Sequence, residues 1–138
     1  MKVRSSLLVR RFYEDVWNNQ NYSAASQILA PTFVFRGSLG SESVGIAPFL
    51  SYVRDIHAAL GDYRCEILEL IAQGANAAAK MRFSGRHREA FLGFLPTGST
   101  ITWHGAAFFK TDLSQILELW VLGDLDSLKA DMAERRET

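Results

Sequence analysis

The chain has 138 residues, 48% of them hydrophobic and 12% aromatic, which predicts one globular domain over residues 1–138 rather than a disordered chain. Its 15 basic and 15 acidic residues cancel, so the usual electrostatic driving force for nucleic-acid binding is missing. Cys65 is the only cysteine, which excludes an internal disulfide, and no apolar run has the length of a secretory leader or a membrane span. We therefore expect a cytoplasmic protein that binds neither nucleic acid nor membrane.

The chain begins with two predicted helices. Residues 3–19 have the spacing of an amphipathic helix with a wide apolar side, on which Tyr13 and Trp17 lie. Ser23 is a typical N-cap for a second, short helix over residues 24–29. The width of the apolar side of the first helix indicates a helix that covers a sheet.

A short strand and a third helix follow. Residues 32–36 have high β-propensity and contain Phe33 and Phe35, and residues 37–45 form a loop rich in Ser and Gly. A helix is predicted over residues 48–60, because Pro suits the first helical turn and apolar side chains then recur at helical spacing.

In the second half of the chain the hydrophobic period changes from 3.6 to 2. Alternation predicts strands over residues 63–72, 77–85, 100–110 and 116–122, and a C-terminal helix capped within residues 124–127. Helices and an antiparallel sheet are thus segregated along the chain, which predicts an α+β fold. The long late strands suggest a curved sheet that wraps a cavity, which is the default place for a ligand.

Two polar residues are candidates for acid/base catalysis. Trp103 and His104 point to opposite sides of their strand, so only one of them faces the cavity. An inward His104 could orient a carbonyl group or move a proton, whereas an outward one would have a structural role or lie in a dimer contact. Asp124 could direct a carboxylate into the mouth of the cavity or cap the last helix, a role for which Asp126 competes.

Aromatic side chains are candidates for the wall of the cavity, with ordinary core packing as the alternative. The three histidines are far apart in the sequence and have no metal-binding spacing, so no metal site is predicted. Cys65 is interpreted as a small buried hydrophobic residue, and residues 85–89 as a solvated loop near the rim. The candidate substrate-binding residues are Tyr13, Trp17, Phe33, Phe35, Phe83, Phe91 and Trp120.

Several short motifs follow one another along the chain from about Leu8 to Leu128. They are Phe12-Tyr13 with Val16-Trp17-Asn18, residues 30–34, residues 67–74, residues 83–87, residues 93–98, and residues 116–120 followed by Asp124. In this order the motifs resemble the SnoaL-like polyketide cyclase family of the nuclear transport factor 2-like superfamily. The resemblance implies a cone-shaped, curved antiparallel or mixed sheet, which is wrapped around a cavity and covered by the N-terminal helices.

The resemblance also implies a chemistry. Cyclases of this family close a ring by an intramolecular aldol reaction without metal or organic cofactor, in which a carboxylate removes a proton next to a carbonyl. We place the family's acid/base Asp directly after its Trp, in the order Glu-His-Trp-Asp. This chain reads Glu118-Leu119-Trp120-Val121, so the His and Asp positions are both apolar and the cyclase base is absent.

We therefore expect a homodimeric domain, without cofactor, that binds a small, mostly apolar or carbonyl-containing molecule in its cone. If it is an enzyme, cyclase- or isomerase-type acid/base chemistry would depend on His104 and Asp124. A non-catalytic binding domain is the alternative, which the apolar Val121 favours. A protein-interaction domain that uses the open face of the sheet is a third possibility, and an outward Glu118 would serve such a face or a dimer.

Overall fold

The computed structural model describes residues 4–137. Over these residues the chain forms helices in its first half and at its end, with a six-stranded sheet between and beside them. The elements in chain order are α1 (Arg4–Arg11), the π-helix η1 (Phe12–Asn18), the 3-10 helix η2 (Tyr22–Ala24), α2 (Ala25–Ile28), β1 (Leu29–Arg36), β2 (Glu42–Val44), α3 (Ile46–Ala59), β3 (Leu60–Gln73), β4 (Asn76–His87), β5 (Thr100–Thr111), β6 (Ile116–Gly123) and α4 (Leu125–Glu137).

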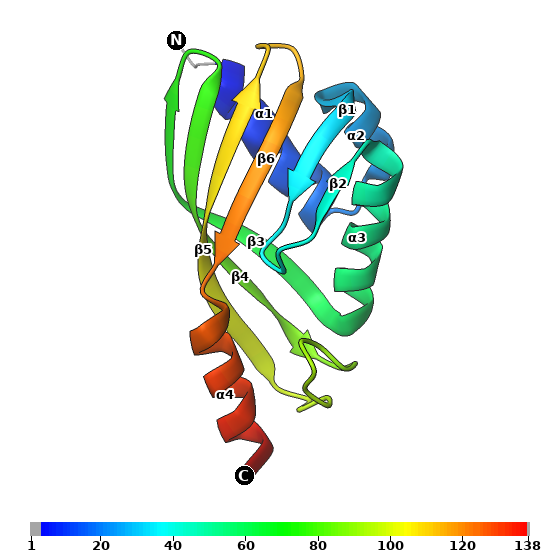
Figure 1. Ribbon diagram of the computed structural model, residues 1–138, viewed down its shortest axis with the longest axis vertical. Helices are drawn as coiled ribbons and strands as arrows, with labels where there is room; N and C mark the ends of the chain where they lie inside the picture. The colour runs from blue at the N-terminus through cyan, green and yellow to red at the C-terminus, as the bar shows by residue number, and fades with distance from the viewer. Residues whose placement is uncertain (1–3, 138) are drawn as a thin grey trace.

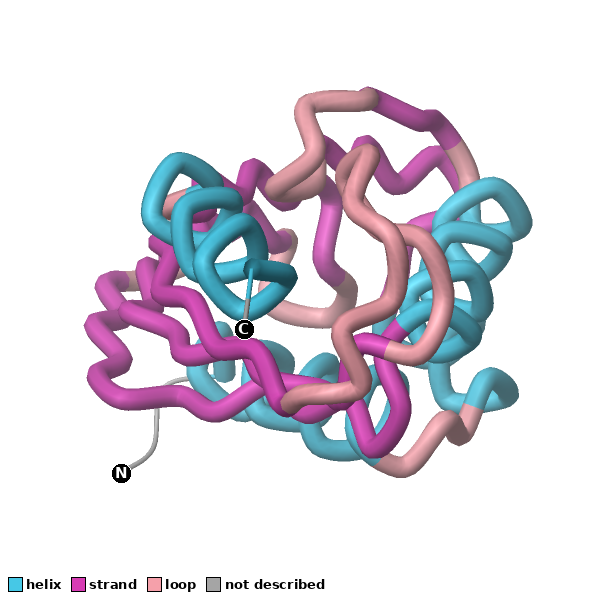
Figure 2. The backbone as a smooth tube through the Cα atoms, turned by 90° about the horizontal axis from the view of Figure 1, so that it is seen from below, coloured by secondary structure: helices cyan, strands magenta, loops and turns pink. Residues whose placement is uncertain are grey.

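The sheet is mixed, with the strand order β2-β1-β6-β5-β4-β3. β1 runs parallel to β6, and every other neighbouring pair is antiparallel. The sheet curls without closing, and α1, η1 and α3 pack against its inner face, while α4 extends from its lower end (Figure 1). Seen from that end, loops lie between α4 and α3 (Figure 2). The predicted α+β fold with a cone-shaped sheet is confirmed.

The curvature of the sheet comes from irregular positions in its long strands. The register of β3 against β4 shifts twice, between Gly61 and Arg64 and again between Ile67 and Glu69. Such bulges bend a strand and increase its twist. At the crossing of β5 with the end of β6, a Cβ atom on Gly105 would lie only 2.9 Å from the Leu122 carbonyl oxygen, so this close approach requires glycine.

The first predicted helix is present, but its second half differs from a regular α-helix. From Phe12 onward it is a π-helix, and the Asn19 amide donates to the Glu14 carbonyl five residues earlier, at 3.0 Å. The wider turn still keeps the apolar side inward, so that Tyr13 and Trp17 are buried. Val3, the first residue of the predicted helix, lies outside the described residues.

The strands differ from the prediction most clearly at the start of β1, at β2, and where β3 and β4 pair. β1 begins at Leu29, before Pro31, because its pairing with β6 is irregular until Val34 and tolerates a residue without an amide hydrogen. The predicted loop after it contains β2. β3 begins directly after α3, and its first residue Leu60 pairs with His87, so that β4 extends into the run predicted as a solvated loop.

The core is a continuous set of aromatic rings between the helices and the inner face of the sheet. Phe49 of α3 is central, with ring centroids 5.4 Å from Phe12, 5.4 Å from Phe33 and 4.8 Å from Phe35. Among the described residues, no helix has both the length and the apolar character needed to cross a bilayer. Within residues 4–137, no three His, Cys, Asp or Glu side chains gather as a group that could hold a metal ion.

Candidate functional site

A small cavity lies inside the cone, between η1, α3, the inner face of β3 to β6 and the loop that joins β1 to β2. The empty space measures about 30 Å³, which is room for one or two water molecules. Most of its wall is aromatic. The predicted wall residues that line it are Tyr13, Trp17, Phe35, Phe83 and Phe91.

The other two predicted wall residues lie elsewhere. Phe33 is fully buried one layer behind the wall, where its ring packs between those of Phe12 and Phe35. Trp120 is 44% exposed on the outer face of β6, with its ring 5.9 Å from that of Phe108. Trp120 points outward because its neighbours along the strand take the inward positions.

Those inward neighbours are Leu119 and Val121, and both line the cavity. They are the two positions at which the family resemblance predicts a His and an Asp and at which this sequence is apolar. The side of the cavity formed by β6 is therefore hydrophobic. A carboxylate at position 121 would have faced the cavity, and Val121 offers no proton acceptor there.

The alternation of β5 places Trp103 inside and His104 outside. Trp103 is 4% exposed and lines the cavity, whereas the side chain of His104 is exposed on the outer face. The backbone of His104 has a structural contact, since its carbonyl accepts a hydrogen bond from the Asp124 amide at 2.8 Å. The catalytic role of His104 stays a prediction, and its side chain is not among those that line the cavity.

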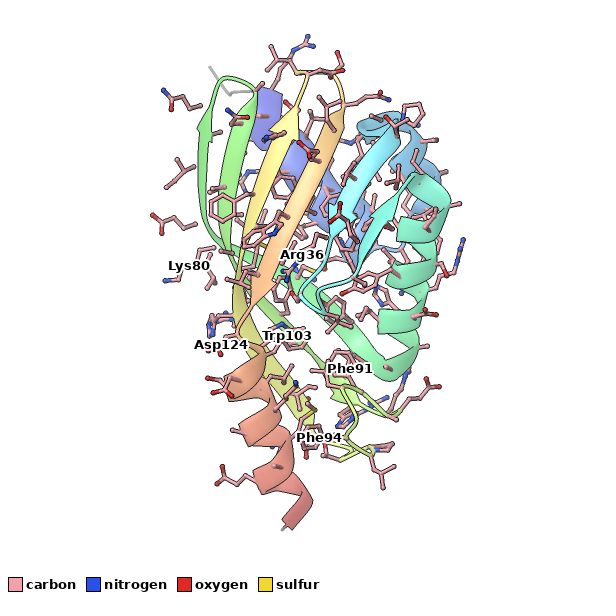
Figure 3. All side chains as sticks on the ribbon, viewed as in Figure 1. Arg36, Lys80, Phe91, Phe94, Trp103 and Asp124 are labelled. Carbon is pink, nitrogen blue, oxygen red and sulfur yellow. The ribbon has the colours of Figure 1, made fainter. Side chains whose placement is uncertain are left out.

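Asp124 is also exposed, at the end of β6. Its Oδ1 accepts a hydrogen bond from the Ser127 amide at 3.2 Å, which is the geometry of an N-cap on α4. Trp103 and Phe91 lie together at the lower end of the cone, and Asp124 is apart from them (Figure 3). Its predicted catalytic role is likewise untested, and its carboxylate does not line the cavity.

The polar atoms of the cavity come mostly from residues that sequence reasoning did not select. The Tyr63 hydroxyl and the Cys65 thiol interact with each other, and Tyr52 interacts with the backbone of the rim residue Leu39. The alternation that buries Cys65 would have pointed to Tyr63, two residues earlier on the same face of β3. The same alternation rule places the Trp103 side chain inside, once the neighbouring His104 is known to face outward.

Two buried polar atoms at the cavity have no hydrogen-bond partner among the described residues. They are the Tyr13 hydroxyl and the indole Nε1 of Trp103. Tyr13 comes from the π-helix and Trp103 from β5, and their residues are 2% and 4% exposed. Since nearly all buried polar groups in native proteins are hydrogen-bonded, each unpaired one requires an explanation.

All ionisable groups that line the cavity are held in their neutral form. Burial raises the pKa of the Tyr13 and Tyr63 hydroxyls well above its usual value, and the nearby Cys65 raises both further. Burial also raises the pKa of the Cys65 thiol, although the hydrogen bond with Tyr63 acts in the opposite direction. No carboxylate and no imidazole is found among the described residues that line the cavity.

Side chains behind the wall fix its position. The Asn18 amide group donates to the Cys65 carbonyl at 2.9 Å and accepts from the Cys65 amide at 2.8 Å, so the end of η1 is paired with β3. The Nε2–H of His57 donates to the Trp17 carbonyl at 2.8 Å. Burial lowers the pKa of His57, which keeps this imidazole neutral at pH 7.

The loop between β1 and β2 closes the cavity on one side through Gly37, Ser38 and Leu39. It approaches the wall so closely that a Cβ atom on Gly37 would lie 2.9 Å from both the Phe35 ring and the Tyr52 hydroxyl. Access to the cavity therefore depends on the position of this loop, whose Leu39 is partly exposed.

Comparison with known protein families gives a match over most of the chain. The family model described as SnoaL-like polyketide cyclase matches residues 7–132. Comparison of the sequence with curated proteins gives no match.

Solved structures share the fold at low sequence identity. A SnoaL-like protein from Jannaschia sp. CCS1 is similar with a TM-score of 0.83 and 16% identity, over 94% of this chain and 91% of that one. A SnoaL-like polyketide cyclase from Agrobacterium tumefaciens has a TM-score of 0.80 and 15% identity, over 96% and 99% of the two chains. A protein with a ketosteroid isomerase-like fold from Catenulispora acidiphila, in complex with trimethylamine, has a TM-score of 0.77 and 14% identity, over 91% and 92%.

At these identities the solved structures support the fold, and the match of the family model supports the family. That match extends from α1 into α4 and includes every residue that lines the cavity. The chain belongs to the SnoaL-like polyketide cyclase family.

Proposed function

We propose that the protein binds a small, uncharged and mostly apolar molecule in the cavity of its cone. The observation that carries this proposal is the wall itself, which is largely aromatic and whose ionisable groups are neutral at pH 7. An apolar pocket with a few convergent polar groups is the usual form of a small-molecule site. The trimethylamine complex of a structural neighbour is in keeping with a fold that takes small molecules.

Binding requires the cavity to widen. A cavity of roughly 150 Å³ holds benzene, whereas the space in this structure is about 30 Å³. The loop over residues 37–41 is the part of the wall that can move without breaking the sheet, because it joins the ends of β1 and β2. We therefore propose that the ligand enters past Ser38 and Leu39.

Ligand binding is favoured over turnover by the composition of the wall. Removal of a proton next to a carbonyl requires a base within hydrogen-bonding distance of that proton. The described wall contains no carboxylate or imidazole, and Val121 occupies the position at which the family resemblance predicts the Asp. An acid/base reaction by His104 or Asp124 would need either side chain to leave the outer surface that it occupies here.

The experiment is calorimetric titration with indane, an uncharged bicyclic hydrocarbon, into the wild type and two variants of β6. Val121→Phe fills the cavity and is expected to abolish the binding that the wild type shows. Leu122→Phe is the matched control, because the next residue on the strand is 52% exposed on the outer face and should leave binding unchanged. A wild type that does not bind indane, or a Val121→Phe variant that still does, contradicts the proposal.

We also propose that the protein is a homodimer that pairs through the outer face of its sheet. An apolar row of Ile71, Ala78, Phe108 and Trp120 crosses this face on four adjacent strands. Arg36 of β1 pairs with Trp120 and lies at the end of the row. Ile71, Phe108 and Trp120 are 63%, 52% and 44% exposed, and the guanidinium of Arg36 lies 5.2 Å from the Trp120 ring.

The charges beside this row make it suitable for a second copy of the same chain. Lys110 and Glu118 lie next to it as an exposed ion pair with 3.6 Å between Nζ and the carboxylate. A two-fold axis would set each charge against the opposite one on the partner, around a shared apolar centre.

Sedimentation velocity tests the dimer. The wild type is expected to sediment as a dimer at micromolar concentration, and Trp120→Glu as a monomer, because a charge would be buried at the centre of the interface. Leu95→Glu is the control, since Leu95 is 57% exposed in the loop before β5 and away from the row. A monomeric wild type would leave the row to a different protein partner and contradict this part of the proposal.

A further inference from the structure

We propose that Tyr13 and Trp103 form a pair of hydrogen-bond donors that selects ligands carrying an uncharged acceptor, such as the carbonyl oxygen of a ring ketone. This inference rests on the proposed function, since it names the chemical class of the molecule that the cavity binds. The two side chains would be specificity residues of the binding site.

The first step of the argument is the cost of the two unpaired groups. The Tyr13 hydroxyl and Trp103 Nε1 are buried without a partner among the described residues. A buried polar group without a hydrogen bond destabilises a protein, because it has given up its hydrogen bonds to water and gained none in return. Phe at position 13 would fill nearly the same space without this cost, so the two polar atoms are explained by an acceptor inside the cavity, and a ligand atom can take that place from a water molecule.

The second step is the direction of the hydrogen bonds. An indole N–H only donates. A hydroxyl both donates and accepts, but the Tyr13 hydroxyl keeps its proton, because burial and the nearby Cys65 raise its pKa well above the usual value. Each site thus offers a proton to an acceptor atom, and neither can pair with a carboxylate without burying a net charge.

The third step is that three other polar side chains deep in the wall already have partners, whereas the hydroxyl of Ser38 lies in the loop at the rim. The Tyr63 hydroxyl and the Cys65 thiol interact with each other, and Tyr52 interacts with the Leu39 backbone. Of the described side chains that line the cavity, Tyr13 and Trp103 are the ones whose buried polar atoms are left for a ligand.

The shape of the surroundings favours a flat molecule. The Trp103 ring has the rings of Phe83, Phe91 and Tyr63 around it, with centroids at 5.5, 6.0 and 6.1 Å. Figure 3 shows Phe91 beside Trp103 at the lower end of the cone. A planar ring among these side chains gains stacking contacts while its acceptor atom meets one of the donors.

The test compares indane with 1-indanone, which has the same bicyclic frame and adds one carbonyl oxygen. Calorimetric titration is expected to show that the wild type binds 1-indanone more tightly than indane by about fivefold, the ratio that one net hydrogen bond contributes. Tyr13→Phe and Trp103→Phe are each expected to reduce that preference. Tyr13→Phe removes a hydroxyl without a partner, so this variant is expected to fold at least as stably as the wild type.

Tyr22→Phe is the control, because the Tyr22 hydroxyl bonds to Gln20 and does not line the cavity. It should keep the full preference for 1-indanone. Equal binding of indane and 1-indanone by the wild type, or an unchanged preference in both donor variants, overturns this inference and leaves the proposed function standing. Binding of neither compound overturns the proposed function and this inference with it.

Discussion

At the scale of single residues, Asn18 shows how one polar side chain fixes the position of the cavity wall. Its amide group makes both hydrogen bonds that a neighbouring strand would make with Cys65, at 2.9 and 2.8 Å. The pairing falls where β3 has just passed a bulge, between Gly61 and Arg64, and lacks a strand partner on that side. Asn18 thereby connects the π-helix that presents Tyr13 to the strand that presents Cys65.

We expect Asn18→Ala to lower the free energy of unfolding by about 1–3 kcal/mol, because the amide and the carbonyl of Cys65 lose their partner in a partly buried place. Urea denaturation measures this change. Asn19→Ala is the matched control, since the Asn19 side chain is exposed and should have little effect. Equal stability of the two variants would mean that water replaces the Asn18 amide group at no cost.

At the scale of secondary-structure elements, the junction of β6 with α4 decides what Asp124 does. The strand ends at Gly123, and the helix begins at Leu125, which leaves Asp124 as the N-cap residue between them. Two buried side chains of α4, Leu128 and Met132, then hold the helix against the core. The cap is thus a structural role that is sufficient to explain an Asp at this position.

This role predicts that two substitutions of Asp124 have different effects on stability. Asp124→Ala is expected to reduce the free energy of unfolding by about 0.5–2 kcal/mol, because the Ser127 amide loses its acceptor. Asp124→Asn should keep most of the stability, since Asn is an equally good N-cap. Thermal unfolding followed by circular dichroism compares the two. A large loss of stability in Asp124→Asn would show that the carboxylate charge itself has a further role.

At the scale of the whole molecule, the interior is organised to remain neutral. Burial raises the pKa of Cys65, Tyr13 and Tyr63 and lowers that of His57, so each group is uncharged in the folded protein at pH 7. The unfolded chain has ordinary pKa values, near 9.0 for Cys, 10.0 for Tyr and 6.5 for His. Stability must therefore change with pH wherever only the unfolded chain changes its charge.

We expect the free energy of unfolding to be highest between about pH 6.5 and pH 9, the ordinary values for His and Cys. The stability that the neutral thiol contributes is fully present below pH 9 and is lost as the pH rises toward the raised pKa of folded Cys65. Each such group contributes a slope of about 1.4 kcal/mol per pH unit. In the other direction, the contribution of His57 is present above pH 6.5 and is lost as the pH falls.

Urea denaturation from pH 5 to pH 11 measures this profile, with Cys65→Ala as the matched variant. Its stability should fall only from about pH 10, where the tyrosines of the unfolded chain begin to ionise. A wild-type profile that is flat from pH 8 to pH 11 would contradict the neutral interior.

The sequence alone contains much of the fold, because hydrophobic period is a local property. Period 3.6 predicts the helices that became α1 with η1 and α3, and period 2 predicts the strands that became β3, β4, β5 and β6. The family motifs add the cone, and the family match supports it. The π-helical turns of η1, the short β2 and the early start of β3 were not predictable, since each depends on contacts with distant parts of the chain.

The residues of the candidate site were harder to predict from the sequence than the fold. Alternation shows that Trp103 and His104, or Trp120 and Val121, lie on opposite faces, but it does not say which face is the inner one. Only the packing of the helices against the sheet decided that Trp103 and Val121 line the cavity and that His104 and Trp120 face outward. The sequence by itself determined the family, the absence of a carboxylate at position 121 and the aromatic character of the interior. The tertiary structure decided which side chains meet, because a strand presents both of its faces equally until another element covers one of them.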